Sequence, residues 1–101
     1  MRFVFRGKSF KLDFKSLKND WGICWSEYPR YITISNKIKD QKLLLDVLIH
    51  ESLHACYPDL EERAVDNAAT DIADFLWELG WRPSNSIIPK RKRKISKRKK
   101  K

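Results

Sequence analysis

Two histidines lie four residues apart in the run His50-Glu51-Ser52-Leu53-His54. On an α-helix, residues four apart lie one above the other on the same face, so the two imidazoles converge on one point. Glu51 lies about 100° further round the helix, beside that point. This is the spacing of two zinc ligands and a glutamate that acts as general base. They are the only histidines in the chain, and they predict a metal site.

A helix that contains the two histidines would have apolar residues on nearly every side, which indicates that it is buried. Its apolar residues are Leu43, Leu44, Leu45, Val47, Leu48, Ile49, Leu53, Ala55 and Cys56. Burying two imidazoles and a carboxylate without partners would be costly, and a divalent cation would supply the partner. The alternative interpretation is a pair of core histidines with satisfied hydrogen bonds.

A catalytic zinc site has three protein ligands and one open position. With no third histidine, the remaining ligand must be a carboxylate or a cysteine. Cys56 points away from the histidine face, and the pattern does not place Cys24. The nearest acids are Glu61, which falls near the centre of the apolar stripe of the next helix, and Glu62, which falls on its flank. Glu62 has the alternative role of capping-box partner to Asp59, and spacing alone does not choose between the two glutamates.

The elements that must position these residues are four short strands followed by two helices. Strands are expected at residues 2–6, 9–14, 21–27 and 31–35, the first two forming a hairpin around Gly7. Asp40 is the expected N-cap of a helix over residues 41–57, and Asp59 that of a second helix over residues 60–79. We therefore expect an α+β fold in which an antiparallel or mixed sheet of about four strands packs on both helices.

Three segments resemble the small phage and bacterial zinc metallopeptidase domains of the minimal, SprT-like zincin type. They are Ile32-Thr33-Ile34-Ser35, the stretch 44–55 that contains the histidines, and the stretch 58–65. The resemblance covers roughly residues 21–82. It implies a sheet whose edge strand lines a cleft, the histidine-bearing helix packed on that sheet, and a second helix carrying a glutamate ligand. In the resembling domains this ligand lies three residues before the valine of the second helix, which favours Glu62 over Glu61.

These residues together predict a zinc-dependent peptidase acting on a peptide or protein substrate. Zinc (Zn²⁺) held by His50, His54 and Glu62 would lower the pKa of a bound water and polarise a peptide carbonyl. Glu51 would take the proton from that water and return it to the leaving amine. Asp46, one turn before His50, is expected either to orient that imidazole or to be a solvated acid on the helix edge.

The positive charge of the chain is concentrated at its end. The 101 residues include 22 Lys and Arg against 13 Asp and Glu, a net charge of +9. Residues 89–101 hold ten of the cations and no acid, so residues 1–88 hold 12 cations against 13 acids. We expect a metallopeptidase domain over residues 1–88 and a disordered basic tail over residues 89–101.

The tail over residues 89–101 suits non-specific binding to the DNA or RNA backbone, with a steep dependence on salt. It contains no aromatic residue on which a base could stack. A solubilising tail and a nuclear-import signal are the alternatives. The rival function for the whole chain is a non-catalytic accessory protein associated with nucleic acid, whose zinc site is structural or degenerate.

Other classes are excluded by composition. The longest apolar stretch, residues 43–49, is interrupted by Asp46 and is far shorter than the roughly 20 residues of a membrane span. The first residues contain no signal-peptide core. Two cysteines at no metal-ligand spacing make no disulfide framework. We therefore expect a cytoplasmic monomer with no membrane association.

Overall fold

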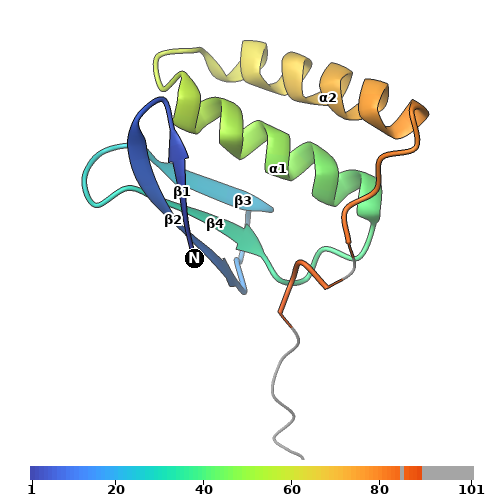
Figure 1. The fold of residues 1–101 in the computed structure, drawn as a ribbon, viewed down its shortest axis with the longest axis horizontal. Coiled ribbons are helices and arrows are strands. Elements are labelled where there is room, and N and C mark those ends of the chain that lie inside the picture. Colours follow the sequence, from blue (N-terminus) through green and yellow to red (C-terminus); the bar gives the residue numbers. More distant parts are fainter. Residues whose placement is uncertain (85, 90–101) are drawn as a thin grey trace, which may run out of the picture.

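A computed structural model describes residues 1–84 and 86–89 of the chain (Figure 1). Its N-terminal hairpin is closed by a two-residue turn at Arg6 and Gly7. Both turn residues have positive φ, at 49° and 80°, which is the geometry of a type I′ turn. The turn joins β1 (Arg2–Phe5) to β2 (Lys8–Lys15) in antiparallel pairing. The hairpin predicted around Gly7 is therefore confirmed.

Two further strands complete a mixed sheet. They are β3 (Gly22–Trp25) and β4 (Tyr31–Ser35), and the strand order is β1-β2-β4-β3. β2 and β4 run parallel, whereas the other two pairs are antiparallel. The third strand was predicted over residues 21–27, but it begins one residue later and ends two residues earlier, because the chain already bends at Glu27. β3 forms one edge of the sheet.

The histidine-bearing helix, α1 (Gln41–Cys56), begins where the sequence predicts. The Asp40 side chain accepts hydrogen bonds from the backbone N–H groups of Lys42 and Leu43, at 2.9 and 3.4 Å. These donors have no partner within the first turn of a helix, so the cap satisfies them. α1 packs across the sheet against β1, β3 and β4.

The second helix, α2 (Glu62–Glu78), begins two residues later than the sequence predicts. Its N-cap is Glu61, which makes no side-chain capping bond, so the predicted capping box of Asp59 and Glu62 is wrong. The reason is the turn that follows α1, in which the Leu60 N–H donates to the carbonyl of Tyr57 at 3.0 Å. Glu62 is therefore not used as a capping partner.

The end of α2 follows the prediction. Gly80 has a φ of 96°, a left-handed conformation that glycine adopts at little cost. The N–H of Gly80 donates to the carbonyl of Trp77, and that of Trp81 to the carbonyl of Leu76, both at 3.0 Å. This pair of bonds is a Schellman motif.

The elements form successive layers, with α1 lying between the sheet and α2 (Figure 1). The α+β class and the four-stranded sheet are as predicted. The buried apolar residues come from the sheet, both helices and the connection before α1: Phe10, Ile32, Ile34, Ile38, Leu44, Val47, Ala55, Val65, Ala69 and Ala73. α1 is less buried than its composition suggests, because most of its remaining apolar side chains are partly exposed.

Within residues 1–84 and 86–89, neither helix is both long and apolar enough to cross a bilayer. The predicted basic tail lies outside the described residues, apart from Pro89.

The corrected start of α2 predicts unequal effects of two cap substitutions. Asp40→Ala removes the side-chain cap of α1 and is expected to lower the free energy of unfolding by about 1 kcal/mol. Asp59→Ala removes no capping bond and is expected to change it by less than about 0.5 kcal/mol. Urea denaturation of both variants measures the difference. Equal losses would contradict the cap assignment.

Candidate metal centre

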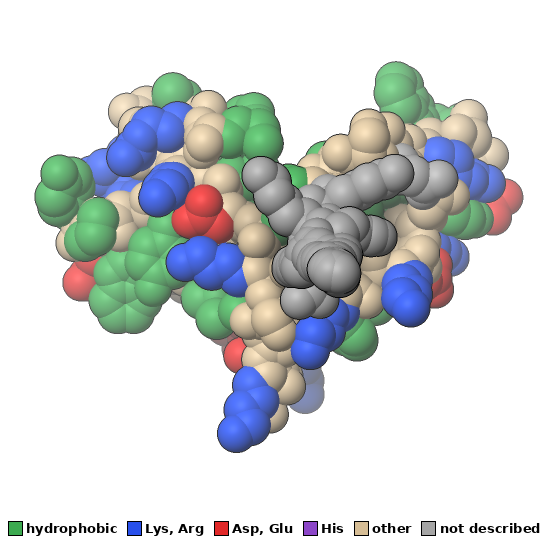
Figure 2. All heavy atoms as spheres, turned by 90° about the horizontal axis from the view of Figure 1, so that it is seen from below, with side chains coloured by type: hydrophobic (Ala, Val, Ile, Leu, Met, Phe, Trp, Pro, Cys, Tyr) green, Lys and Arg blue, Asp and Glu red, His purple; other side chains and the backbone are tan. Residues whose placement is uncertain are grey.

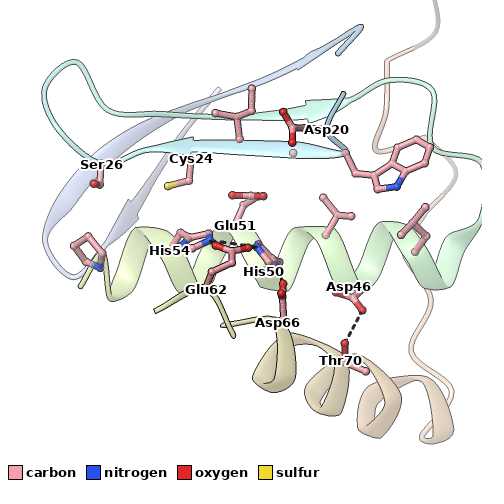
Figure 3. A pocket seen from close by; sticks show the side chains of 16 residues that line it. Asp20, Cys24, Ser26, Asp46, His50, Glu51, His54, Glu62, Asp66 and Thr70 are labelled. Carbon is pink, nitrogen blue, oxygen red and sulfur yellow. Dashed lines mark hydrogen bonds and ion pairs between the residues drawn. The ribbon is translucent and has the colours of Figure 1, made fainter. Parts of the chain in front are cut away.

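The two histidines of α1 converge as their spacing predicts. The Nε2 atoms of His50 and His54 lie 3.2 Å apart, on the face of α1 that meets the start of α2 (Figure 3). Their side chains are 17% and 24% exposed. Both rings are therefore largely shielded from water while one nitrogen of each faces the same point.

Glu62, in the first turn of α2, contacts both histidines. Its Oε2 lies 3.0 Å from Nε2 of His50, and its Oε1 lies 3.0 Å from Nε2 of His54. The three side chains offer one ligand atom each within 4.8 Å of one another. Glu61, the alternative third ligand, is exposed at the N-cap and is not in this group. Its predicted position in the apolar stripe is wrong because α2 begins after it.

Asp66 contacts the other nitrogen of His50. Its Oδ1 lies 3.3 Å from Nδ1, so the carboxylate can accept the Nδ1 proton and fix the orientation of the ring. The sequence offered Asp46 either this role or that of a solvated acid on the helix edge, and the structure gives the role to Asp66. Asp46 instead accepts a hydrogen bond from the Thr70 hydroxyl at 3.4 Å. Asp66 was missed although it lies one helical turn after Glu62.

The charges of this group favour a bound cation. When His50 donates its Nδ1 proton to Asp66, its Nε2 carries a lone pair that faces the carboxylate of Glu62. The Nε2 of His54 lies in the same space. The repulsion between lone pairs and a negative charge so close together is relieved by a proton on one of the Nε2 atoms or by a bound cation. Two imidazole nitrogens and a carboxylate oxygen are a fitting donor set for a divalent metal, and His50, His54 and Glu62 can hold one.

Glu51 is buried beside this group and is 5% exposed. Its carboxylate points into the cleft between α1 and β3 (Figure 3), and within the described part of the chain it has no hydrogen-bond partner. Burial raises the pKa of Glu51 to about 7, and the nearby charges of Glu62 and Asp20 add to the increase while His50 opposes it. Glu51 can therefore exchange a proton near neutral pH.

Gly22 of β3 makes the room that Glu51 occupies. A Cβ at this position would lie 2.9 Å from both Cγ and Oε2 of Glu51, and 2.9 Å from Cγ1 of Val47. A glycine inside a strand often marks a place where another group approaches closely. That signal is present in the sequence, but it does not reveal which group approaches.

His50, His54 and Glu62, which we call the metal group, lie in a cleft of about 760 Å³ between β3 and the two helices. Among the described residues that line it are five acids and no Lys or Arg; the acids are Asp20, Asp46, Glu51, Glu62 and Asp66. The cleft therefore has a negative potential that attracts cations. Cys24 also lines it, outside the His50, His54 and Glu62 group. Burial raises the pKa of the Cys24 thiol to about 12, so the thiol is protonated at neutral pH.

Comparisons of the chain with protein-family models, with curated proteins and with solved structures found no match. Any function of the site must therefore be inferred from its geometry.

The raised pKa of Glu51 predicts a pH-dependent effect of Glu51→Gln on the metal-free protein. The carboxyl has a pKa of about 7 when folded and 4.5 as the reference value, so its ionisation opposes folding above pH 7 and has no effect well below pH 4.5. In the presence of a metal chelator at pH 8, the free energy of unfolding of the variant is expected to be about 3 kcal/mol larger than that of the wild type. That difference should shrink towards zero as the pH falls to 4.5. Urea denaturation across this range tests it, and a constant difference would contradict the burial argument.

Proposed function

We propose that the protein is a zinc-dependent peptidase. The observation that carries the proposal is the convergence of His50, His54 and Glu62 within 4.8 Å, next to the buried carboxylate of Glu51. The donor set suits zinc, which accepts two imidazoles and one carboxylate and leaves a fourth position open. The resemblance of the sequence to SprT-like zincins supports the same proposal.

Each residue of the site has a defined part in peptide hydrolysis. When bound, zinc supplies Lewis acidity, which activates water and polarises a carbonyl group. His50, His54 and Glu62 hold the ion, and Asp66 fixes the orientation of the His50 ring through Nδ1. Glu51 receives the proton of the attacking water and passes it to the leaving amine.

The edge strand of the sheet favours a peptide as the substrate. β3 is an edge strand, and residues 22–24 of this strand line the same cleft as the metal group. An edge strand offers backbone N–H and C=O groups with which an extended peptide can pair. Such pairing would place a peptide bond beside Glu51 without requiring a particular side-chain sequence.

The burial of Glu51 argues for a catalytic rather than a structural zinc site. A structural site is closed by four ligands and needs no proton acceptor beside it. Here a further side chain beside the three candidate ligands, the Glu51 carboxylate, is only 5% exposed, lies against Gly22 and has no hydrogen-bond partner among the described residues. Burial of this kind is unfavourable for folding, and the general-base role explains it.

The ligand set is tested by metal content. The purified wild type is expected to retain one zinc ion per chain after dialysis. Elemental analysis by plasma mass spectrometry measures this zinc content. Glu62→Gln is expected to lose it, whereas Glu61→Gln, the matched neighbour, should retain it. Asp66→Asn should weaken zinc affinity about ten- to 100-fold, as loss of an outer-shell partner does elsewhere. Full zinc retention by Glu62→Gln would contradict the ligand set.

The reaction is tested with an unfolded protein as substrate. The wild type is expected to cleave it, to lose activity in chelator and to regain activity with zinc. Glu51→Gln should retain zinc but cleave the substrate at least about 100-fold more slowly than the wild type, because the general base is absent. If a zinc-loaded wild type and Glu51→Gln cleave equally, or neither cleaves, the peptidase proposal is wrong.

A further inference from the structure

Charge is divided between the two halves of the folded chain. Residues 1–39, which contain all four strands, hold nine Lys or Arg against three Asp or Glu, a net +6. Residues 40–88, which contain both helices, hold three Lys or Arg against ten Asp or Glu, a net −7. A polyanion is therefore attracted to the sheet and repelled from the helices that form most of the metal cleft.

Among the described residues, no helix packs on one face of the sheet. α1 packs on the other face, and α2 lies beyond α1 (Figure 1). In β2, Phe10 and Leu12 belong to the core that α1 covers. Because successive side chains of a strand point to opposite faces, Lys11 points to the face away from α1. We call this the outer sheet face.

A row of two cations and two aromatic rings crosses the outer sheet face. Arg2 pairs with Lys11, Lys11 with Tyr31, and Tyr31 with Trp25, one residue from each strand. Directly paired residues share a face, so all four lie on the face to which Lys11 points. The row spans three strand spacings, about 14 Å. We call these four residues the outer row.

The aromatic half of the outer row is a stacked pair of rings that is partly exposed to solvent. The rings of Trp25 and Tyr31 are nearly parallel, with an interplanar angle of 16° and centroids 6.5 Å apart. Trp25 is 48% exposed, and neither ring belongs to the hydrophobic core. An exposed tryptophan on a strand offers a large surface that is not used for folding.

The cationic half lies beside these rings. The Lys11 side chain is 55% exposed, and its Nζ lies 3.8 Å from a carboxylate oxygen of Asp13, a weak surface pair that a phosphate can replace. Lys15, four residues further along β2 on the same face, adds a third cation. Seen from below, the molecule shows Lys and Arg side chains next to hydrophobic ones (Figure 2).

From this row we propose that the outer sheet face binds single-stranded nucleic acid. Bases stack on the exposed indole ring of Trp25, which Tyr31 supports from beside it, and Arg2 and Lys11 neutralise phosphates. Stacking aromatics combined with a positive surface are the general means of binding single strands, and sheet surfaces of four strands use them. A duplex keeps its bases stacked inside and cannot use the rings. The proposal does not depend on the peptidase proposal, because the outer row shares no residue with the metal group.

The outer row also complements the basic tail of the sequence. Residues 89–101 contain ten cations and no aromatic residue, so they can attract a backbone but cannot distinguish single strands from duplexes. The outer row supplies that distinction.

The test uses the full chain and fluorescence anisotropy with a labelled oligothymidylate or oligouridylate of about 15 nucleotides. Trp25→Ala is expected to weaken binding to both about 5- to 100-fold. Trp25→Leu, which keeps an apolar side chain, should give the same loss, and Trp25→Phe should restore most of the affinity. Trp81→Ala is the matched control, because Trp81 is 64% exposed but follows α2; it should bind as the wild type does.

A duplex of the same length and a salt titration complete the experiment. Trp25→Ala should leave duplex affinity and zinc content unchanged. Lys11→Gln should reduce the slope of log affinity against log salt by about 0.7, whereas Lys42→Gln, a lysine of α1 paired with Asp74 at 2.8 Å, should not. Unchanged single-strand affinity in both Trp25→Ala and Trp25→Leu would overturn the proposal, and so would an equal loss for single strand and duplex.

Discussion

The packing of α1 against α2 is the constraint on which the site depends. His50 and His54 lie one turn apart on α1, and Glu62 and Asp66 lie one turn apart on α2. Because the two helices run side by side (Figure 1), the equal spacing brings Glu62 to both imidazoles and Asp66 to the far nitrogen of His50. A shift of α2 by one residue would turn both carboxylates away from the histidines. The group thus needs the whole helix pair, although its two histidines come from a single turn.

The sheet contributes to the site from the opposite side. Gly22 at the edge strand leaves space for Glu51, which is the only charged residue in the buried set of the described chain. Burying that carboxylate opposes folding at neutral pH, and the apolar contacts of α1 with the sheet must offset it. The acids of the cleft and the cations of the sheet also separate two surfaces of opposite charge. Zinc chemistry and nucleic-acid binding would therefore occupy different faces of one small fold.

Much of this fold follows from local sequence patterns. The Asp40 cap, the hairpin at Gly7 and the end of α2 at Gly80 are set by residues within a few positions of each feature. The convergence of His50 and His54 follows from helical periodicity alone. The start of α2, the choice of Asp66 over Asp46 and the role of Gly22 were not predicted, because each depends on how separate elements pack. The third ligand, Glu62, was predicted only in part. Spacing in the sequence left Glu61 and Glu62 equally possible, and only the resemblance to zincins favoured Glu62. The role predicted for residues 89–101 falls outside the described residues, apart from Pro89.

The central claim is that two helices place three donor atoms around one metal ion. A crystal of the zinc-loaded protein, measured on both sides of the zinc absorption edge, tests it most directly. The account predicts one anomalous peak at about 2.0–2.2 Å from Nε2 of His50, Nε2 of His54 and a carboxylate oxygen of Glu62, with Glu51 near the ion but not bound to it. A peak at other residues, or a zinc ion coordinated by Glu51 in place of Glu62, would contradict it.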